Sequence, residues 1–230
     1  EDLDRYPRDE AGDLTKAEQW GVDVVFIPAV KEMYPREQHL NIQVSTDLTD
    51  KLCGKSRPGH FDGVATVVMK LAQLIHPDRI YFGMKDAQQV AVVKRLVADF
   101  HLTMEVVAVE TVREADGLAK SSRNVYLHND ERSQAVVLYQ TLAEIGTMIE
   151  QKPSGLTWGE LLQTARNRME SVPLARIDYI DILSWPDLSI LPENGNVMDT
   201  TGEVIMALAV YFGKTRLIDN QIWHIPPGGE

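Results

Sequence analysis

Two kinds of apolar pattern alternate along the first half of this chain, and the alternation strongly constrains its fold. Runs rich in valine, isoleucine and aromatic residues predict buried strands at 22–27, 79–82 and 104–109. A polar helix is predicted at 8–20, where Gly21 ends it, and apolar residues at helical spacing predict helices at 63–75 and from Asp86 to Phe100. This order of elements is typical of a parallel sheet covered by helices. The sequence therefore predicts an α/β domain.

The pattern changes after about Thr111. Helices are predicted at 130–150 and 157–171, and strands at 177–183, at 197–200 (the weakest of them) and at 204–211. Helices followed by meandering strands indicate a smaller α+β domain. We therefore expect one domain over 1–111, a second over 112–224, and a disordered tail over 225–230.

The chain is acidic, with a formal net charge of -11 over 230 residues. Nonspecific binding to nucleic acid or to a membrane surface depends on basic patches, so we expect neither kind of partner. The single cysteine, Cys53, excludes an intramolecular disulfide and fits a reducing cytoplasm. A few lysines and arginines can still create a local site for an anionic small molecule.

The tetrapeptide Gly83-Met84-Lys85-Asp86 follows a predicted strand and opens a helix. Ligands of parallel sheets bind at the carboxyl ends of the strands, and free N–H groups at a helix start favour phosphate. Lys85 could therefore bind phosphate and Asp86 a ribose hydroxyl. The tetrapeptide by itself is equally typical of a capped helix with a solvated lysine.

Two further segments carry candidate residues. Lys120-Ser121-Ser122-Arg123 places two hydroxyls between two cations, which suits a polyphosphate, although such a string is also common in surface turns. Arg57 could hold a carboxylate, and His60 could position substrate or transfer a proton. A turn that leads into a helix would explain that second segment equally well.

Taken together and in this order, seven strings resemble the pantothenate synthetase (pantoate–β-alanine ligase) family. They lie at 1–8, 30–35, 57–64, 82–89, 97–99, 117–124 and 216–220. The resemblance covers nearly the whole chain. It implies a Rossmann-like domain of the nucleotidylyl transferase type, a smaller carboxy-terminal domain that closes over the site, and a homodimer.

The resemblance also implies roles for particular residues. Gly83, Met84, Lys85 and Asp86 would contact ATP, with Lys85 on the phosphates. Lys120, Ser121, Ser122 and Arg123 would bind the ATP phosphates as well, and Val112 would lie against the adenine. Gln89 would bind pantoate. Lys85, Ser121, Ser122 and Arg123 are the candidate catalytic residues, whereas Arg57 and His60 match a motif near the site.

This sequence departs from the family pattern in several places. The family begins with a His-x-Gly-His motif and an Asn-Pro-x-Gln-Phe motif, which are both absent here, so we expect an amino-terminal segment to be missing. Met84 stands where glutamate is usual, Ala87 where an aromatic residue is usual, and Lys120 where a neutral residue is usual.

The implied reaction is the ATP-dependent condensation of pantoate with β-alanine through a pantoyl-adenylate. Mg²⁺ would bind chiefly through ATP oxygens, and Asp13 is a weak candidate ligand. Two alternatives remain at this point: a different nucleotidylyl transferase, and a truncated fragment that binds nucleotide without turnover. Release of AMP on addition of β-alanine would separate them.

Overall fold

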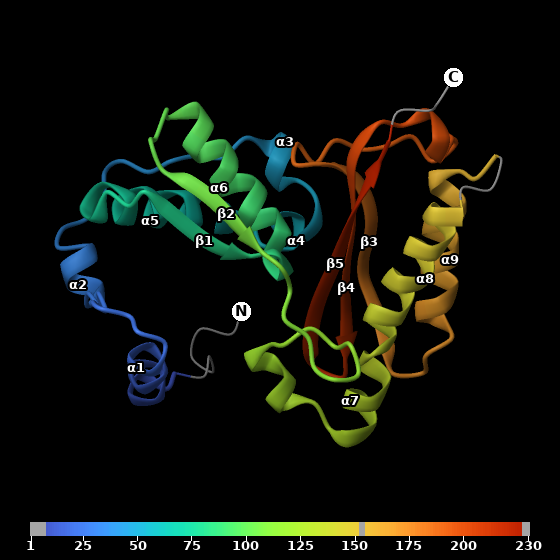
Figure 1. The fold of residues 1–230 in the computed structure, drawn as a ribbon, viewed down its shortest axis with the longest axis horizontal. Helices are drawn as coiled ribbons and strands as arrows, with labels where there is room; N and C mark the ends of the chain where they lie inside the picture. The colour runs from blue at the N-terminus through green and yellow to red at the C-terminus, as the bar shows by residue number, and fades with distance from the viewer. Residues whose placement is uncertain (1–7, 152–154, 227–230) are drawn as a thin grey trace. The chain divides into compact units, whose positions relative to one another are not determined.

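A computed structural model describes residues 8–151 and 155–226 of the chain (Figure 1). The chain divides into two compact units, residues 1–40 and 41–230. In the first unit, α1 (Glu10–Gln19) matches the predicted first helix, and α2 (Val30–Met33) was not predicted. The helix α1 begins at Asp9, whose side chain accepts the backbone N–H of Gly12 at 3.0 Å.

The predicted buried strand at 22–27 is wrong. These residues form no regular element, and most of them are well exposed, with Val24 at 81% and Phe26 at 52%. A strand is stable only when its backbone groups pair with a neighbour. An apolar run predicts burial, but it does not supply a pairing partner.

The second unit opens with an α/β part. Its helices are α3 (Thr46–Thr49), α4 (Leu52–Ser56), α5 (His60–Ile75) and α6 (Ala87–Asp99). Its strands β1 (Arg79–Gly83) and β2 (Glu105–Val109) pair in parallel, from Arg79 opposite Glu105 to Gly83 opposite Val109. The predicted strands at 79–82 and 104–109 are therefore confirmed, and so is their parallel order. The 3₁₀ turn η1 (Met84–Asp86) joins β1 to α6.

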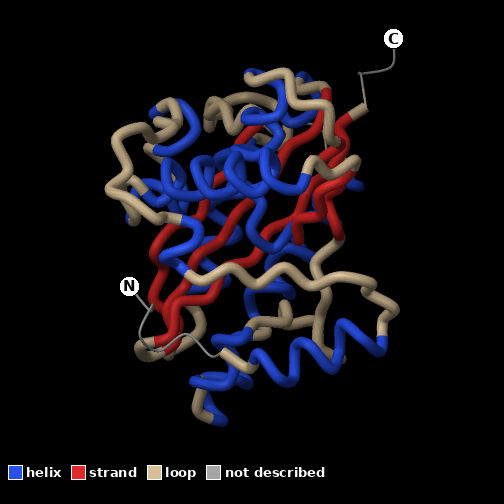
Figure 2. Tube along the Cα trace, turned by 90° about the vertical axis from the view of Figure 1, so that its left-hand side faces the viewer, coloured by secondary structure: helices blue, strands red, loops and turns tan. Residues whose placement is uncertain are grey.

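The rest of the unit is an antiparallel sheet with helices. It contains the 3₁₀ turn η2 (Ser122–Tyr126), the helices α7 (Asn129–Ala135), α8 (Val137–Gln151) and α9 (Trp158–Glu170), and a further turn, η3 (Val197–Asp199). The strands β3 (Ala175–Trp185), β4 (Gly202–Phe212) and β5 (Thr215–Ile225) pair in that order. Figure 2 draws these strands, like β1 and β2, in red. The helices α8 and α9 pack on this sheet and on each other.

Three local predictions for this part need correction. The predicted strand at 197–200 is the turn η3, because Asn196 caps a short 3₁₀ helix there. The helix predicted at 130–150 is interrupted at Val136 and forms α7 and α8. The strand β5 was not predicted, because polar Asp219, Asn220 and Gln221 interrupt its apolar run.

The helix α6 links the two sheets through hydrophobic contacts. One cluster combines its Val92, Val93 and Leu96 with residues of α5. Another combines its Val90 and Ala91 with residues of the antiparallel sheet, such as Ile205. Most of the sheet and the helices α8 and α9 form a third, larger cluster. The start of α6 is thereby held between the two sheets.

The predicted domain boundary at residue 111 lies inside the second unit, between β2 and η2. A functional division at that point remains a prediction. The predicted tail overlaps β5 at Ile225, while 227–230 lie outside the described residues. Within the described ranges, no helix is both long and apolar enough to cross a membrane.

Candidate active site

The segment Gly83–Asp86 lies at the carboxyl end of β1, where it turns into α6. Gly83 has an ordinary φ of -71°, and a Cβ built on it would meet no atom within 4 Å. Open space therefore lies beside this backbone. The Lys85 side chain is only 18% exposed, and its Nζ lies 4.0 Å from Oδ2 of Asp86. The arrangement places one cation and one carboxylate at the edge of the parallel sheet.

The neighbouring glutamines, Gln88 and Gln89, have different surroundings. Gln88 is buried, and its amide accepts the N–H of Gly54 at 3.2 Å and donates to two carbonyls of the 48–51 segment. Gln89 is half-buried, and its side chain makes no hydrogen bond to the described residues. Gln88 is therefore committed to holding α4 against α6, and Gln89 keeps its donors and acceptor available for a ligand.

Arg57 and His60 lie together at the junction of α4 and α5. Arg57 Nη1 lies 3.2 Å from His60 Nε2, so the arginine donates to a neutral imidazole. Partial burial, and then the positive charge of Arg57, lower the pKa of His60, while Asp86 opposes this shift. Gly59 permits the turn before α5 with a φ of +75°.

A short hairpin precedes the second predicted phosphate segment. Lys120 N donates to Val112 O at 2.8 Å, and Gly117 forms the bend with a φ of +94°. The side chain of Val112 is 62% exposed. Lys120 is exposed as well, at the end of the hairpin that leads into Ser121. The hairpin thus presents two of the predicted ATP-binding residues to solvent.

Ser121 caps the turn η2, since its Oγ accepts the N–H of Arg123 at 3.2 Å. Ser122 is exposed, and Arg123 is half-buried. The turns η1 and η2 both contact β5 (Figure 1). The structure therefore brings the Lys85 segment and the Ser121–Arg123 segment to the same strand, although 35 residues separate Lys85 from Lys120 along the chain.

Three polar residues that sequence reasoning did not single out as site residues lie where these segments meet. The carboxylate of Asp219, on β5, accepts two hydrogen bonds from the Arg113 guanidinium, at 2.7 and 3.0 Å. The Asn220 amide donates to Met84 O at 2.8 Å and to Lys85 O at 3.1 Å. The available signal was an acid and an amide directly after the apolar pair Leu217 and Ile218.

The weak metal candidate, Asp13, belongs to the first unit. Its Oδ1 lies 3.4 Å from Lys16 Nζ, and both side chains are largely exposed. Among the residues that the structure describes, no three His, Cys, Asp or Glu side chains group into a site for a metal ion.

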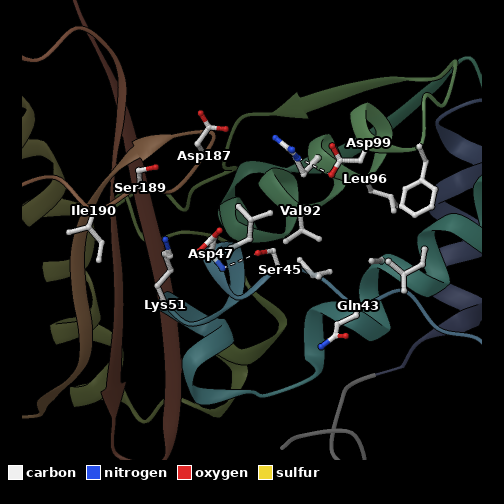
Figure 3. A pocket seen from close by; sticks show the side chains of 16 residues that line it. Gln43, Ser45, Asp47, Lys51, Val92, Leu96, Asp99, Asp187, Ser189 and Ile190 are labelled. Carbon is white, nitrogen blue, oxygen red and sulfur yellow. Dashed lines mark hydrogen bonds and ion pairs between the residues drawn. The ribbon is translucent and has the colours of Figure 1, made fainter.

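A cavity of about 590 Å³ lies elsewhere, lined mainly by α6, the 42–51 segment and the loop 187–190 (Figure 3). Its polar lining includes Lys51, Asp47 and Asp187, and none of the predicted site residues. A smaller cavity, of about 450 Å³, is lined partly by Arg57. The volumes of these cavities therefore do not identify the predicted site. The predicted site is identified instead by the two phosphate segments, which both contact β5.

Comparison with known proteins agrees with the predicted fold and family. Residues 1–222 match the family model described as Pantoate-beta-alanine ligase. A pantothenate synthetase of Geobacillus sp. (strain WCH70) is 51% identical over 221 residues, which are 96% of this chain and 75% of the relative. That of Geobacillus kaustophilus is 49% identical over 230 residues, or 100% of this chain and 74% of the relative.

Solved structures agree. The pantothenate synthetase of Thermus thermophilus has a TM-score of 0.88 at 42% identity, covering 99% of this chain and 78% of that chain. A pantoate–β-alanine ligase from Francisella tularensis, complexed with β,γ-ATP and β-alanine, has a TM-score of 0.69 at 32% identity. That match covers 96% of this chain and 72% of the other. The predicted fold class, a Rossmann-like sheet followed by a smaller α+β part, is confirmed.

Proposed function

This chain belongs to the pantoate–β-alanine ligase family and joins pantoate to β-alanine, and we propose that the ligation passes through a pantoyl-adenylate. A carboxylate is a poor acylating agent because its leaving group would be oxide. A pantoate carboxylate oxygen therefore attacks the α-phosphorus of ATP, and the bond to the pyrophosphate oxygen breaks. The neutral β-alanine amine then attacks the acyl carbon, expels AMP and loses a proton.

The convergence of η1 and η2 on β5 carries this proposal. Adenylation needs cations and donors on both sides of a triphosphate, because negative charge moves toward the departing pyrophosphate. Lys85 approaches from the end of β1, and Ser121, Ser122 and Arg123 approach from the other segment. Each segment alone is typical of an ordinary turn, whereas the two together supply what a polyphosphate requires.

The remaining residues have supporting roles in this proposal. Gly83 and Asp86 lie on the ribose side of the nucleotide, Met84 contacts ATP within the same segment, and Val112 packs against the adenine. Gln89 binds pantoate with its side-chain amide, whereas the amide of Gln88 is already hydrogen-bonded within the protein. Arg57 and His60 position substrate, and burial together with the positive charge of Arg57 lowers the pKa of His60.

ATP use is supported by the relative from Francisella tularensis, whose structure contains a β,γ-ATP ligand and β-alanine. We propose that Mg²⁺ accompanies the nucleotide and is held chiefly by phosphate oxygens, which its preference for oxygen ligands and retained waters allows. Asp13, paired with Lys16, remains a weak candidate ligand. Bound Mg²⁺ would neutralise phosphate charge, and Lys85 and Arg123 would add to that neutralisation.

The first test replaces Lys85 by alanine in the full-length protein. Pantoate-dependent adenylation, measured in a single turnover, should slow by about 10²–10³-fold, the range found for removal of a transition-state donor. Lys94→Ala, on the helix α6 that follows η1, is the matched control and should retain its rate. A loss below tenfold for Lys85→Ala would refute the role of this lysine.

Gly83→Val tests whether nucleotide occupies the open space beside η1. The φ of -71° suits valine, and no protein atom lies within 4 Å of a Cβ placed at this position, so folding should be unaffected. ATP affinity, measured by calorimetry, should nevertheless fall. Gly63→Ala, a second glycine with open space, is the control. Unchanged ATP affinity for Gly83→Val would place the nucleotide elsewhere.

The alternatives separate in one assay. A pantoate–β-alanine ligase with an adenylate intermediate forms pyrophosphate with ATP and pantoate, and releases AMP only when β-alanine is added. A different nucleotidylyl transferase would not respond to β-alanine, and a nucleotide-binding fragment would bind ATP without forming either product.

We also propose a cytoplasmic homodimer, which light scattering would show as twice the mass of one chain.

A further inference from the structure

Asp219 is an acidic side chain inside the protein, and its surroundings explain how it is tolerated. It is 1% exposed, and a buried carboxylate is stable only when it is paired. Arg113 supplies that pair through two hydrogen bonds, at 2.7 and 3.0 Å. The same guanidinium lies over the Tyr139 ring, 4.7 Å from its centre, and donates to Gly117 O at 3.1 Å. Asp219 therefore anchors the hairpin that leads to Ser121.

Asn220, the next residue, makes the corresponding contacts to the other segment. Its amide nitrogen donates to Met84 O at 2.8 Å and to Lys85 O at 3.1 Å, both in the turn η1. Its backbone N–H donates to Oδ1 of Asp219 at 2.8 Å. One dipeptide of β5 thus holds η1 with one side chain and the hairpin with the other.

The position of this dipeptide in the sheet makes the arrangement possible. Side chains of consecutive strand residues point to opposite faces, and here Asp219 pairs with Leu208 while Asn220 pairs with Ala207. Leu208 belongs to the largest hydrophobic cluster, and Ala207 to the cluster that contains the start of α6. Since β5 is an edge strand, the dipeptide can reach segments on both faces.

We propose that Asp219 and Asn220 are positioning residues that set the separation between Lys85 and the Ser121–Arg123 turn. This inference rests on the proposed function, in which those two segments hold one triphosphate. Asn220 fixes the backbone of η1, and Asp219, through Arg113, fixes the base of the hairpin. Neither residue touches the reacting atoms, so their contribution is geometric and falls on the adenylation step.

Asn220→Asp in the full-length protein tests the proposal. It keeps the size of the side chain but turns its amide donor toward the Met84 and Lys85 carbonyls into a carboxylate oxygen, which repels them. Pantoate-dependent ATP–pyrophosphate exchange should fall by about 100-fold, the cost of a misplacement of about 1 Å at a reacting centre. Aminolysis of supplied pantoyl-adenylate by β-alanine should fall far less, because no pyrophosphate has to be held in that step.

Gln221→Glu is the matched control. It adds the same charge one residue further along β5, at an exposed side chain, and should leave both half-reactions unchanged. Thermal unfolding of each variant reports folding, and the neutral Asn220→Ala provides the same comparison if Asn220→Asp does not fold.

The outcomes separate clearly. A selective loss of exchange, with aminolysis retained, supports the positioning role. An equal loss of both half-reactions, or no loss of either, overturns it. Wild-type protein that shows no pantoate-dependent exchange at all would overturn the proposed function, and this inference with it.

Discussion

The side chains of the two sheets in the second unit differ in how far they are buried. In β4, every side chain from Val204 to Val210 is buried, and helices α8 and α9 pack on the sheet. In the parallel pair, Tyr81 of β1 is 60% exposed and Val109 of β2 is 43% exposed. The sheet whose strand end carries Gly83 and Lys85 thus has the poorer core of its own.

This difference in burial indicates which part of the molecule fixes the position of the predicted site. The residues with candidate chemistry lie on turns at the end of β1 and before α7, where backbone is free to meet a ligand. Rigidity comes from the antiparallel sheet, whose edge strand β5 contacts both turns. Four experiments test this difference between the two sheets.

Arg113→Ala should have the largest effect on stability. It leaves the Asp219 carboxylate, with a side chain 0% exposed, without its cation. Loss of one partner of a buried ion pair should lower the free energy of unfolding by about 4 kcal/mol. Urea unfolding measures it, with Arg95→Ala as the control, because that arginine pairs with Asp99 on the surface. A loss no larger than that of the control would show that the sheet edge does not depend on this pair.

Leu208→Ala, compared with Tyr81→Ala, tests the contrast between the two cores directly. Leu208 is 0% exposed, and a buried leucine cut back to alanine should cost about 3 kcal/mol of unfolding free energy. Tyr81 is largely exposed, so its loss should cost under about 1 kcal/mol. Equal losses in chemical denaturation would mean that the parallel pair is as well packed as the antiparallel sheet.

Gly117→Ala should have a smaller effect, confined to the hairpin. A φ of +94° is strained for alanine, and its Cβ would collide with the Tyr139 ring. Together these should lower the free energy of unfolding by about 2 kcal/mol. Gly83→Ala is the control, since its φ is ordinary and its surroundings are open. A thermal midpoint for Gly117→Ala that matches the control would contradict the described hairpin.

His60 should give the smallest effect, and one that depends on pH. Burial and Arg57 lower its pKa from the ordinary 6.5, so the unfolded chain binds the proton more readily than the folded one. Its contribution to stability is therefore complete above pH 6.5 and declines as the pH falls from there toward the lowered pKa. Unfolding measured from pH 7 to pH 5 should decline less steeply for His60→Gln. Parallel curves for the two proteins would exclude this assignment.

Several elements followed from local pattern alone. Apolar spacing predicted α5, α6 and α9, and short branched runs predicted β1, β2 and β4, because each pattern reports a face that must be buried. The segments around Lys85 and Ser121 could be selected from their residue types and their order. The prediction at 22–27 failed because a strand requires a partner that its own residues do not encode, and β5 was missed because polar residues interrupt its apolar run.

Local sequence could not distinguish Gln88 from Gln89, or find the pair of Arg113 and Asp219. The two glutamines are adjacent and chemically identical, and only the packing of α4 against α6 commits Gln88. Arg113 and Asp219 are 106 residues apart. The seven strings indicated the family by resemblance, and apolar spacing and residue types predicted most of the elements and the candidate ligand-binding turns. Only the tertiary structure decided which polar groups meet, because those contacts depend on how elements far apart in the chain pack together.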